Sequence, residues 1–195
     1  MSSSPVLRLA SASPRRQALL AQIGVPHAVA VADVDESARD GEAVTAYVER
    51  VARAKATAIW ERGQALPVLG ADTTVVLDGV SLGKPRDRAH GLEMLAALAG
   101  REHRVLTAVA LVSAAGTHCL ISDSTVRMRA STPQERQRYW DSGEPRDKAG
   151  GYAIQGLGAV FIESLHGSYS GVMGLPLFET ARLLAAAGVP CWSAS

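Results

Sequence analysis

Cysteine and lysine are scarce in this sequence of 195 residues, and long hydrophobic runs are absent. The two cysteines, Cys119 and Cys191, form no CxxC pair and no zinc-type spacing, which excludes a disulfide framework and a structural zinc site. The N-terminus lacks the apolar core of a signal peptide, and no apolar run approaches the roughly 18 residues of a membrane span. We therefore expect a cytoplasmic protein that does not enter a membrane.

An excess of one charge is also absent, because 20 basic residues face 19 acidic ones and leave a formal net charge of +1. Near neutrality argues against a protein that binds nucleic acid by neutralising many phosphates. The hydrophobic fraction of 47% and the charged fraction of 20% are ordinary for a globular protein. The length suits one domain, so we expect a single domain over residues 1–195 and no nucleic-acid partner.

Three of the basic residues are lysines and the other 17 are arginines. Where arginine serves as the general surface cation, a lysine is expected at positions that need a compact ammonium group. This makes Lys55, Lys84 and Lys148 candidates for specific roles. Each of them, taken alone, is equally consistent with an ordinary surface lysine.

Helix and strand signals alternate along the chain and predict an α/β fold. Asp78-Gly79 indicates a tight hairpin turn, and strands joined by hairpins cannot all be parallel, so we expect a mixed sheet. Ser13 is expected to cap the first helix, and Thr132 and Glu135 to form a capping box. The expected strands are 6–10, 68–77, 80–83, 105–112, 119–129 and 152–163, and the expected helices are 14–24, 42–62, 88–98, 133–140 and 176–187.

The start of the first helix combines two hydroxyls with two cations. Arg15 and Arg16 occupy the first turn, where free N–H groups and the helix dipole already create positive potential. Cations are unfavourable there unless an anion faces them, and Ser11 and Ser13 supply hydroxyls at the same place. This arrangement favours a phosphate site, with pairing of both arginines to local carboxylates as the alternative.

Two candidate carboxylates, Asp72 and Glu36, occur in different sequence contexts. Asp72 follows Gly70-Ala71 within an apolar strand, where a lone carboxylate is costly, so we expect it to meet a metal, a cation or a catalytic proton. Glu36 ends the acidic run 33–36 shortly before a long helix, where such a run usually complements the helix dipole. Thr73 follows Asp72 in the same strand.

The C-terminal third is rich in glycine around one amide. Gln155 precedes Gly156-Leu157-Gly158 and offers both a donor and an acceptor, as reading a nucleobase edge requires; its alternative role is to satisfy backbone groups at a strand end. Neither this segment nor Gly83-Lys84-Pro85 has the spacing of a known phosphate loop. Glycines at this density favour close approach of a flat ligand or local bulges. Between residues 150 and 174 the glycines are Gly150, Gly151, Gly156, Gly158, Gly167, Gly171 and Gly174.

Seven short blocks occur in a fixed order along the chain: LASASPRR at 9–16, DE at 35–36, GADT at 70–73, GKP at 83–85, DKAGGYAIQG at 147–156, GSY at 167–169 and VMGLP at 172–176. In this order the blocks closely resemble the Maf family of nucleoside triphosphate pyrophosphatases, first described as septum formation inhibitors. The resemblance covers nearly the whole sequence.

The resemblance implies an elongated, two-lobed α/β fold with a central mixed sheet flanked by helices and a deep cleft, similar to inosine triphosphate pyrophosphatases. It implies hydrolysis between the α- and β-phosphates, with Asp72 as proton acceptor. Arg15, Thr73 and Gln155 match positions associated with substrate choice. Members that prefer 7-methyl-GTP carry Trp, Gln and Glu at these positions, so the chain resembles the dTTP/UTP branch.

From these assignments we expect catalytic roles for Asp72, Lys84 and Glu36, with a divalent cation, Mg²⁺ or Mn²⁺, held by Glu36 and Asp72. Substrate binding is assigned to seven residues: Ser11, Ser13, Arg15, Arg16, Lys55, Thr73 and Gln155. Two alternatives remain open: a nucleotide-sensing inhibitor of septum formation that binds partners, and a pyrophosphatase for modified purine nucleotides. The resemblance also raises a homodimer and cell-division partners as expectations.

Overall fold

The computed structural model describes residues 4–63 and 65–192 and divides the chain into two compact units. The first unit comprises the residues up to Asp72, Thr107–Ser122 and the residues from Gly174 onward. The second unit comprises Thr73–Leu106 and Asp123–Met173. Residues 1–3, 64 and 193–195 of the expected single domain lie outside the described residues.

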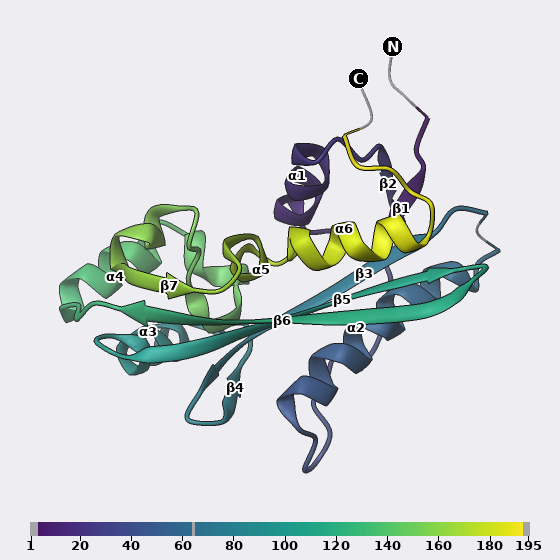
Figure 1. The fold of residues 1–195 in the computed structure, drawn as a ribbon. Helices are drawn as coiled ribbons and strands as arrows, with labels where there is room; N and C mark the ends of the chain where they lie inside the picture. Colours follow the sequence, from purple (N-terminus) through teal and green to yellow (C-terminus); the bar gives the residue numbers. More distant parts are fainter. Residues whose placement is uncertain (1–3, 64, 193–195) are drawn as a thin grey trace. The chain divides into compact units, whose positions relative to one another are not determined.

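The described strands form one mixed seven-stranded sheet in the order β2-β1-β3-β5-β6-β7, with β4 paired to β3 (Figure 1). β1 runs parallel to β2 and β3, whereas β4 pairs antiparallel with β3 and β7 pairs antiparallel with β6. The predicted α/β class with a mixed sheet is therefore confirmed. The strands are β1 (Leu7–Leu9), β2 (His27–Val29), β3 (Val68–Leu77), β4 (Val80–Leu82), β5 (Glu102–Ser113), β6 (Gly116–Met128) and β7 (Ile162–His166).

Helices connect these strands, and within residues 4–63 and 65–192 none is both long and apolar enough to cross a membrane. The capping box of Thr132 and Glu135 is confirmed, but Ser13 does not cap α1 with its side chain. The α-helices are α1 (Pro14–Gln22), α2 (Val44–Trp60), α3 (Arg88–Leu98), α4 (Pro133–Asp141), α5 (Tyr169–Met173) and α6 (Leu177–Ala186). Short 3₁₀ turns occur at Glu144–Asp147, Ala149–Gly151 and Leu157–Phe161.

In the first unit, α2 lies against β3 at Gly70. A Cβ atom at Gly70 would stand 2.5 Å from the carbonyl oxygen of Ala52 and 2.8 Å from the amide nitrogen of Ala56, so only glycine permits this approach. Lys55 extends from the same face of α2, and Asp72 follows Gly70 by two residues. The close contact between helix and strand thus brings Lys55 and Asp72 within reach of each other.

The second unit has an apolar core beneath its irregular segment. Buried side chains of β3, α3, β5, β6 and α4 pack with Tyr152, Ile154 and Phe161. Gly91 of α3 accommodates the indole of Trp140, because a Cβ atom there would stand 2.0 Å from the ring. Tyr139 and Phe161 meet edge to face, with ring centroids 5.3 Å apart.

The expected strand 152–163 is wrong over most of its length. A turn follows Tyr152, the 3₁₀ segment Leu157–Phe161 comes next, and β7 begins only at Ile162. Hydrogen bonds from the amides of Ala153, Leu157 and Gly158 go to side chains and not to a neighbouring strand. β2 and the five-residue α5 were not expected from the sequence at all.

Candidate functional site

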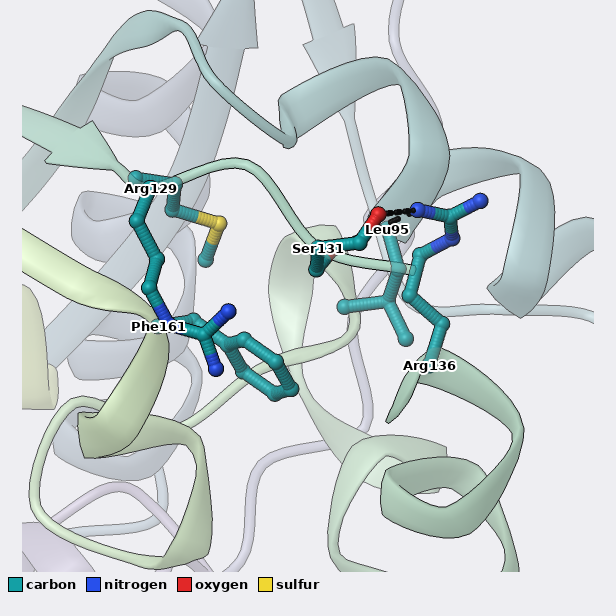
Figure 2. Close-up of a pocket in the computed structure, with 6 residues that line it drawn as sticks. Leu95, Arg129, Ser131, Arg136 and Phe161 are labelled. Atoms are coloured by element: carbon teal, nitrogen blue, oxygen red, sulfur yellow. Dashed lines mark hydrogen bonds between the residues drawn. The ribbon is translucent and has the colours of Figure 1, made fainter. Parts of the chain in front are cut away.

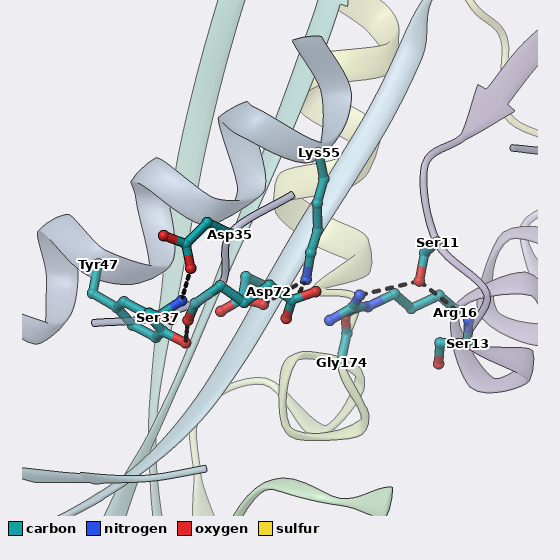
Figure 3. Close-up of polar contacts among 10 residues, drawn as sticks. Ser11, Ser13, Arg16, Asp35, Ser37, Tyr47, Lys55, Asp72 and Gly174 are labelled. Atoms are coloured by element: carbon teal, nitrogen blue, oxygen red, sulfur yellow. Dashed lines mark hydrogen bonds and ion pairs between the residues drawn. The ribbon is translucent and has the colours of Figure 1, made fainter. Parts of the chain in front are cut away.

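Lys55 joins two carboxylates at the centre of the candidate site in the first unit (Figure 3). Its Nζ atom lies 2.9 Å from Asp72 Oδ1 and 3.0 Å from Glu36 Oε2. The side chains of Lys55 and Asp72 are only 10% and 8% exposed, whereas that of Glu36 is 48% exposed. Of the three expected partners of Asp72, a metal, a cation or a catalytic proton, the structure shows a cation, and Lys55 is not an ordinary surface lysine.

Burial controls the protonation of Asp72. It raises the pKa of this carboxyl above the usual 3.8, and the opposing effects of Lys55 and then Arg16 only partly offset that rise. A carboxylate with a raised pKa is a stronger base than an ordinary aspartate, while its cationic neighbours still favour the ionised form. Asp72 therefore has the environment of a proton acceptor.

Side chains of α2 hold the loop that carries Glu36. The hydroxyl of Tyr47 donates to the backbone oxygen of Glu36 at 3.0 Å, and Arg50 donates to the backbone oxygen of Ser37 at 2.9 Å. Arg50 also binds the carboxylate of Glu42 through Nε at 2.6 Å and Nη2 at 2.7 Å. Burial, followed by the charges of Asp72 and Glu36, raises the pKa of Tyr47 to about 12.

These supports were not identified from the sequence. Neither Tyr47 nor Arg50 is among the candidate site residues predicted from the sequence. The acidic run before α2 does more than complement the helix dipole, because the run places Glu36 beside Lys55. The spacing of Tyr47 and Arg50, one turn apart on one helix face beside that run, was the only available signal.

On the other side of Asp72, Arg16 extends from α1 toward the carboxylate (Figure 3). Its Nε donates to the backbone oxygen of Gly174 at 2.7 Å, and its Nη1 donates to Ser11 Oγ at 3.2 Å. The backbone N–H of Ser13 donates to the same Ser11 oxygen at 3.2 Å. Burial lowers the pKa of Arg16, and the nearby charge of Asp72 opposes this effect.

Ser11, Ser13 and Arg16 are thus brought together as expected, next to Asp72. Arg15 lies beside Arg16 in the first turn of α1 and is partly buried. Its charge adds to the burial that lowers the pKa of Arg16. Two guanidinium groups and serine hydroxyls at one helix start have the donors that an oxyanion requires.

Three further predicted residues belong to the second unit: Thr73, Lys84 and Gln155. Thr73 is partly buried in β3, Lys84 is exposed after β4, and Gln155 is exposed in the turn after Tyr152. The backbone oxygen of Gly83 accepts a 3.0 Å hydrogen bond from the amide of Gly150. This contact attaches the loop of Lys84 to the segment that leads to Gln155.

Lys148 has a structural position. Its Nζ donates to the backbone oxygen of Glu144 at 2.8 Å and to Asp147 Oδ1 at 2.6 Å, so it closes the 3₁₀ turn Glu144–Asp147. The side chain is 13% exposed. Among the three lysines, Lys55 has the closest connection to the candidate site, and Lys148 stabilises a turn.

A small pocket of the second unit contains none of the predicted site residues (Figure 2). Arg129 is paired with Glu135 at 2.8 Å and lies over the ring of Phe161, and Arg136 is hydrogen-bonded to Ser131. These arginines stabilise the entry to α4. The pocket is lined by Leu95, Met128, Arg129, Ser131, Arg136 and Phe161.

Glu36 and Asp72 were also predicted to hold a divalent metal. Among residues 4–63 and 65–192, no group of three or more His, Cys, Asp or Glu side chains could hold a metal ion. Mg²⁺ is usually bound by one or two carboxylates together with water and substrate phosphates. The two carboxylates at Lys55 therefore fit a metal whose remaining ligands come from a polyphosphate.

An α/β protein with a buried carboxylate between two cations, beside a helix start rich in oxyanion donors, has the means to act on a phosphorylated compound. Comparison with known proteins agrees with this class. A family model described as Maf-like protein matches residues 6–187. The chain belongs to the Maf family.

Relatives of high identity carry one common name. The chain is 55% identical over 198 residues to a protein of Bordetella parapertussis named dTTP/UTP pyrophosphatase, covering 95% of this chain and 94% of that protein. Proteins of the same name from Hahella chejuensis and Bordetella avium are 54% identical over 190 residues and 56% identical over 194 residues. They cover 96% and 95% of this chain, and 94% and 96% of their own lengths.

Proposed function

We propose that this protein hydrolyses dTTP and UTP to the nucleoside monophosphate and pyrophosphate, and so removes these nucleotides or modified forms of them from the cellular pool. One observation carries the proposal: a buried Asp72, flanked by Lys55 and Arg16, occurs in a chain with 54–56% identity to proteins named dTTP/UTP pyrophosphatase. The identity extends over nearly the full length.

Asp72 acts as the proton acceptor. A water oxygen attacks the α-phosphorus, the bond from this phosphorus to the oxygen that bridges it to the β-phosphorus breaks, and pyrophosphate leaves with the bonding electrons. Asp72 takes the proton from the attacking water. The raised pKa of Asp72 supports this role, because a carboxylate with a higher pKa is a stronger base.

Cations stabilise the negative charge of the triphosphate and of the departing pyrophosphate. We assign this role to Arg15, Arg16, Lys55 and Lys84, with Ser11 and Ser13 as further donors. Charge stabilisation by groups already held in place lowers the barrier more effectively than mobile water does. The hydrogen bonds of Arg16 to Gly174 and Ser11 supply such an arrangement.

A divalent cation, Mg²⁺ or Mn²⁺, would be held by Glu36 and Asp72 together with the phosphates, and would supply further neutralisation of charge there. Tyr47 and Arg50 support this assignment, because they fix the backbone at Glu36 and Ser37. Base selection is assigned to Arg15, Thr73 and Gln155.

The test is a panel of nucleoside triphosphates with Mg²⁺, scored separately for pyrophosphate and orthophosphate. We expect pyrophosphate as the first product and the highest kcat/KM for dTTP and UTP. Stepwise release of orthophosphate would contradict the cleavage position. Preference for a modified purine nucleotide would favour the alternative of a pyrophosphatase for modified purine nucleotides. Tight binding without turnover would favour the nucleotide-sensing inhibitor.

Cytoplasmic localisation follows from this proposal, because the substrates belong to the cytoplasmic nucleotide pool. The homodimer and the cell-division partners stay predictions.

A further inference from the structure

The turn that contains Gln155 leaves the side chain of this residue available. Gln155 is exposed, and within the described part of the chain its amide forms no hydrogen bond. The backbone around it is closed by hydrogen bonds from Gly156 N to Ala153 O at 3.4 Å and from Ala159 N to Gly156 O at 3.1 Å. A side-chain amide on an ordered turn is suited to recognising a ligand when, as here, the hydrogen bonds that close the turn do not involve that side chain.

Tyr139 and Glu144 hold this turn at both ends. The hydroxyl of Tyr139 accepts a 3.0 Å hydrogen bond from the amide of Ala153, two residues before Gln155. The carboxylate of Glu144 accepts hydrogen bonds from the amides of Leu157 at 2.9 Å and Gly158 at 3.0 Å, just after it. Tyr139 also donates to Glu144 Oε1 at 2.7 Å, which joins the two supports.

The glycines of the turn make room for these two side chains. A Cβ atom at Gly156 would stand 2.0 Å from Glu144 Oε2, and one at Gly158 would stand 2.5 Å from the hydroxyl of Tyr139. We expected these glycines to let a flat ligand approach the backbone. On the side where a Cβ atom would lie, this expectation is wrong. That side is occupied by Glu144 and Tyr139.

The supports are themselves anchored. Tyr139 is buried in the core of the second unit against Phe161, and Lys148 binds the backbone oxygen of Glu144. Partial burial raises the pKa of Glu144, but the hydrogen bonds from Tyr139, Gly158 and Leu157 outweigh this effect and lower the pKa overall. Glu144 is therefore an ionised acceptor at neutral pH, and a carboxylate accepts stronger hydrogen bonds than a neutral amide does.

We propose that Glu144 and Tyr139 are positioning residues for base selection, which hold the turn 153–158 so that Gln155 presents its amide to the pyrimidine. The inference rests on the proposed function and adds to it two residues that do not touch the substrate. Their effect on turnover passes through Gln155. Loss of either support changes how well dTTP and UTP are recognised.

A double-mutant cycle with UTP tests this dependence. Glu144→Gln keeps the size of the side chain but replaces one acceptor oxygen by an NH₂ group, so at least one of its three hydrogen bonds is lost. We expect kcat/KM for UTP to fall ~10-fold in Glu144→Gln and by a similar factor in Gln155→Ala. In the double variant the fall is expected to match that of Gln155→Ala alone within ~2-fold.

Tyr139→Phe provides a second route, because it removes the hydroxyl contacts and retains the ring in the core. It is expected to behave like Glu144→Gln in the same cycle. Tyr152→Phe is the matched control: Tyr152 lies in the same core, and its hydroxyl binds His103 at 2.7 Å and no residue of the turn. This control is expected to lower the melting temperature with kcat/KM for UTP unchanged.

The possible outcomes distinguish an error in the proposed function from an error in the positioning role of Glu144 and Tyr139. If the wild-type protein releases no pyrophosphate from dTTP or UTP, the proposed function is wrong and this inference falls with it. If the wild type is active but the factors of Glu144→Gln and Gln155→Ala multiply in the double variant, only this inference is overturned. It is equally overturned if Tyr152→Phe lowers kcat/KM for UTP as much as Tyr139→Phe does.

Discussion

The ammonium of Lys55 and the carboxylate of Asp72 form a 2.9 Å ion pair in which neither side chain is more than one-tenth exposed. Glu36 provides a second carboxylate 3.0 Å from the same ammonium. Removing one partner of a buried pair normally leaves a charge without compensation. Here Lys55 retains one carboxylate when the other is removed, so variants of this site can be expected to fold.

Asp72→Asn is the first such variant. We expect turnover of UTP to fall at least ~100-fold, because the amide cannot accept the proton of the attacking water. Glu36 remains as a partner for Lys55, so the loss of stability should be limited to about 1–3 kcal/mol. The measurements are kcat for pyrophosphate release and urea unfolding. A folded variant with turnover close to the wild type would remove Asp72 from the mechanism.

Arg16→Ala tests the phosphate site at α1. Because a phosphate contact carries no information about the base, KM should rise by the same factor, ~10-fold or more, for every nucleotide that is turned over. Arg53→Ala is the matched control, since Arg53 pairs with Glu49 on the surface of α2 and should leave KM unchanged. An effect of Arg16→Ala restricted to one base would contradict the phosphate role.

Gln155→Glu tests recognition of the pyrimidine. The pairing edge of thymine or uracil presents two carbonyl oxygens and one N–H group, and a glutamate can accept from the N–H but cannot donate to a carbonyl. We expect kcat/KM for dTTP and UTP to fall ~10-fold or more. Activity on 7-methyl-GTP should fall less or rise, because guanine offers N–H donors. An unchanged ratio of kcat/KM for UTP to that for 7-methyl-GTP would show that Gln155 does not select the base.

His103 should make stability depend on pH. Burial lowers the pKa of this histidine from 6.5 to about 4, and within the described residues its Nδ1 atom is buried without a hydrogen-bond partner. Between these two values the unfolded chain binds a proton that the folded protein does not, so stability falls as pH decreases through this window. The expected loss from pH 7 to pH 5 is about 2 kcal/mol from this residue.

Urea unfolding at pH 7 and pH 5 measures this loss, and His103→Gln is the comparison. The variant removes the titrating group, so the difference between its two unfolding free energies should be smaller than in the wild type by roughly that amount. Equal differences in both proteins would show that His103 does not hold its neutral form in the folded state.

The regular part of the fold was predictable where local signals agreed. The apolar run 68–77 matches β3 to the residue, the Asp78-Gly79 turn joins β3 to β4, and Thr132 and Glu135 cap α4. In each case the signal that predicts the element lies within a few residues along the chain. β2 was not predicted, because its three residues are too few to show a pattern and it pairs with β1, whose residues lie 20 positions earlier.

The prediction of a strand over residues 152–161 was wrong for a different reason. The apolar residues of this segment favour a strand, but its amides bind Tyr139 and Glu144, which lie 13 or more residues earlier. The sequence of this segment alone does not indicate that its amides bind Tyr139 and Glu144. The two glycines were a signal, and their reason became clear only when the side chains that fill their space were located.

Within the candidate site, the residue types predicted what kind of partner a side chain needs, but they did not predict which residue supplies it. The carboxylate within an apolar strand predicted a metal, a cation or a catalytic proton at Asp72, and the structure shows a cation there. The sequence did not identify this cation, because Lys55 was equally consistent with a surface lysine. Its identity depends on how closely α2 approaches β3 at Gly70, which is a property of tertiary packing. Gly174 as the acceptor for Arg16 had no local signal, because a backbone carbonyl is common to every residue.

The hydrogen bond between Arg16 and Gly174 joins residues 158 positions apart and has a consequence for synthesis of the protein. Because the first unit combines the residues up to Asp72 with Thr107–Ser122 and the residues from Gly174 onward, it cannot be completed before the segment that begins at Gly174 has left the ribosome. Contacts of such long range also slow folding. A nascent chain that stops before Gly174 would carry the helix start with its arginines but would lack the carbonyl that orients Arg16, so nucleotide binding should arise only once Gly174 has been synthesised and can reach Arg16.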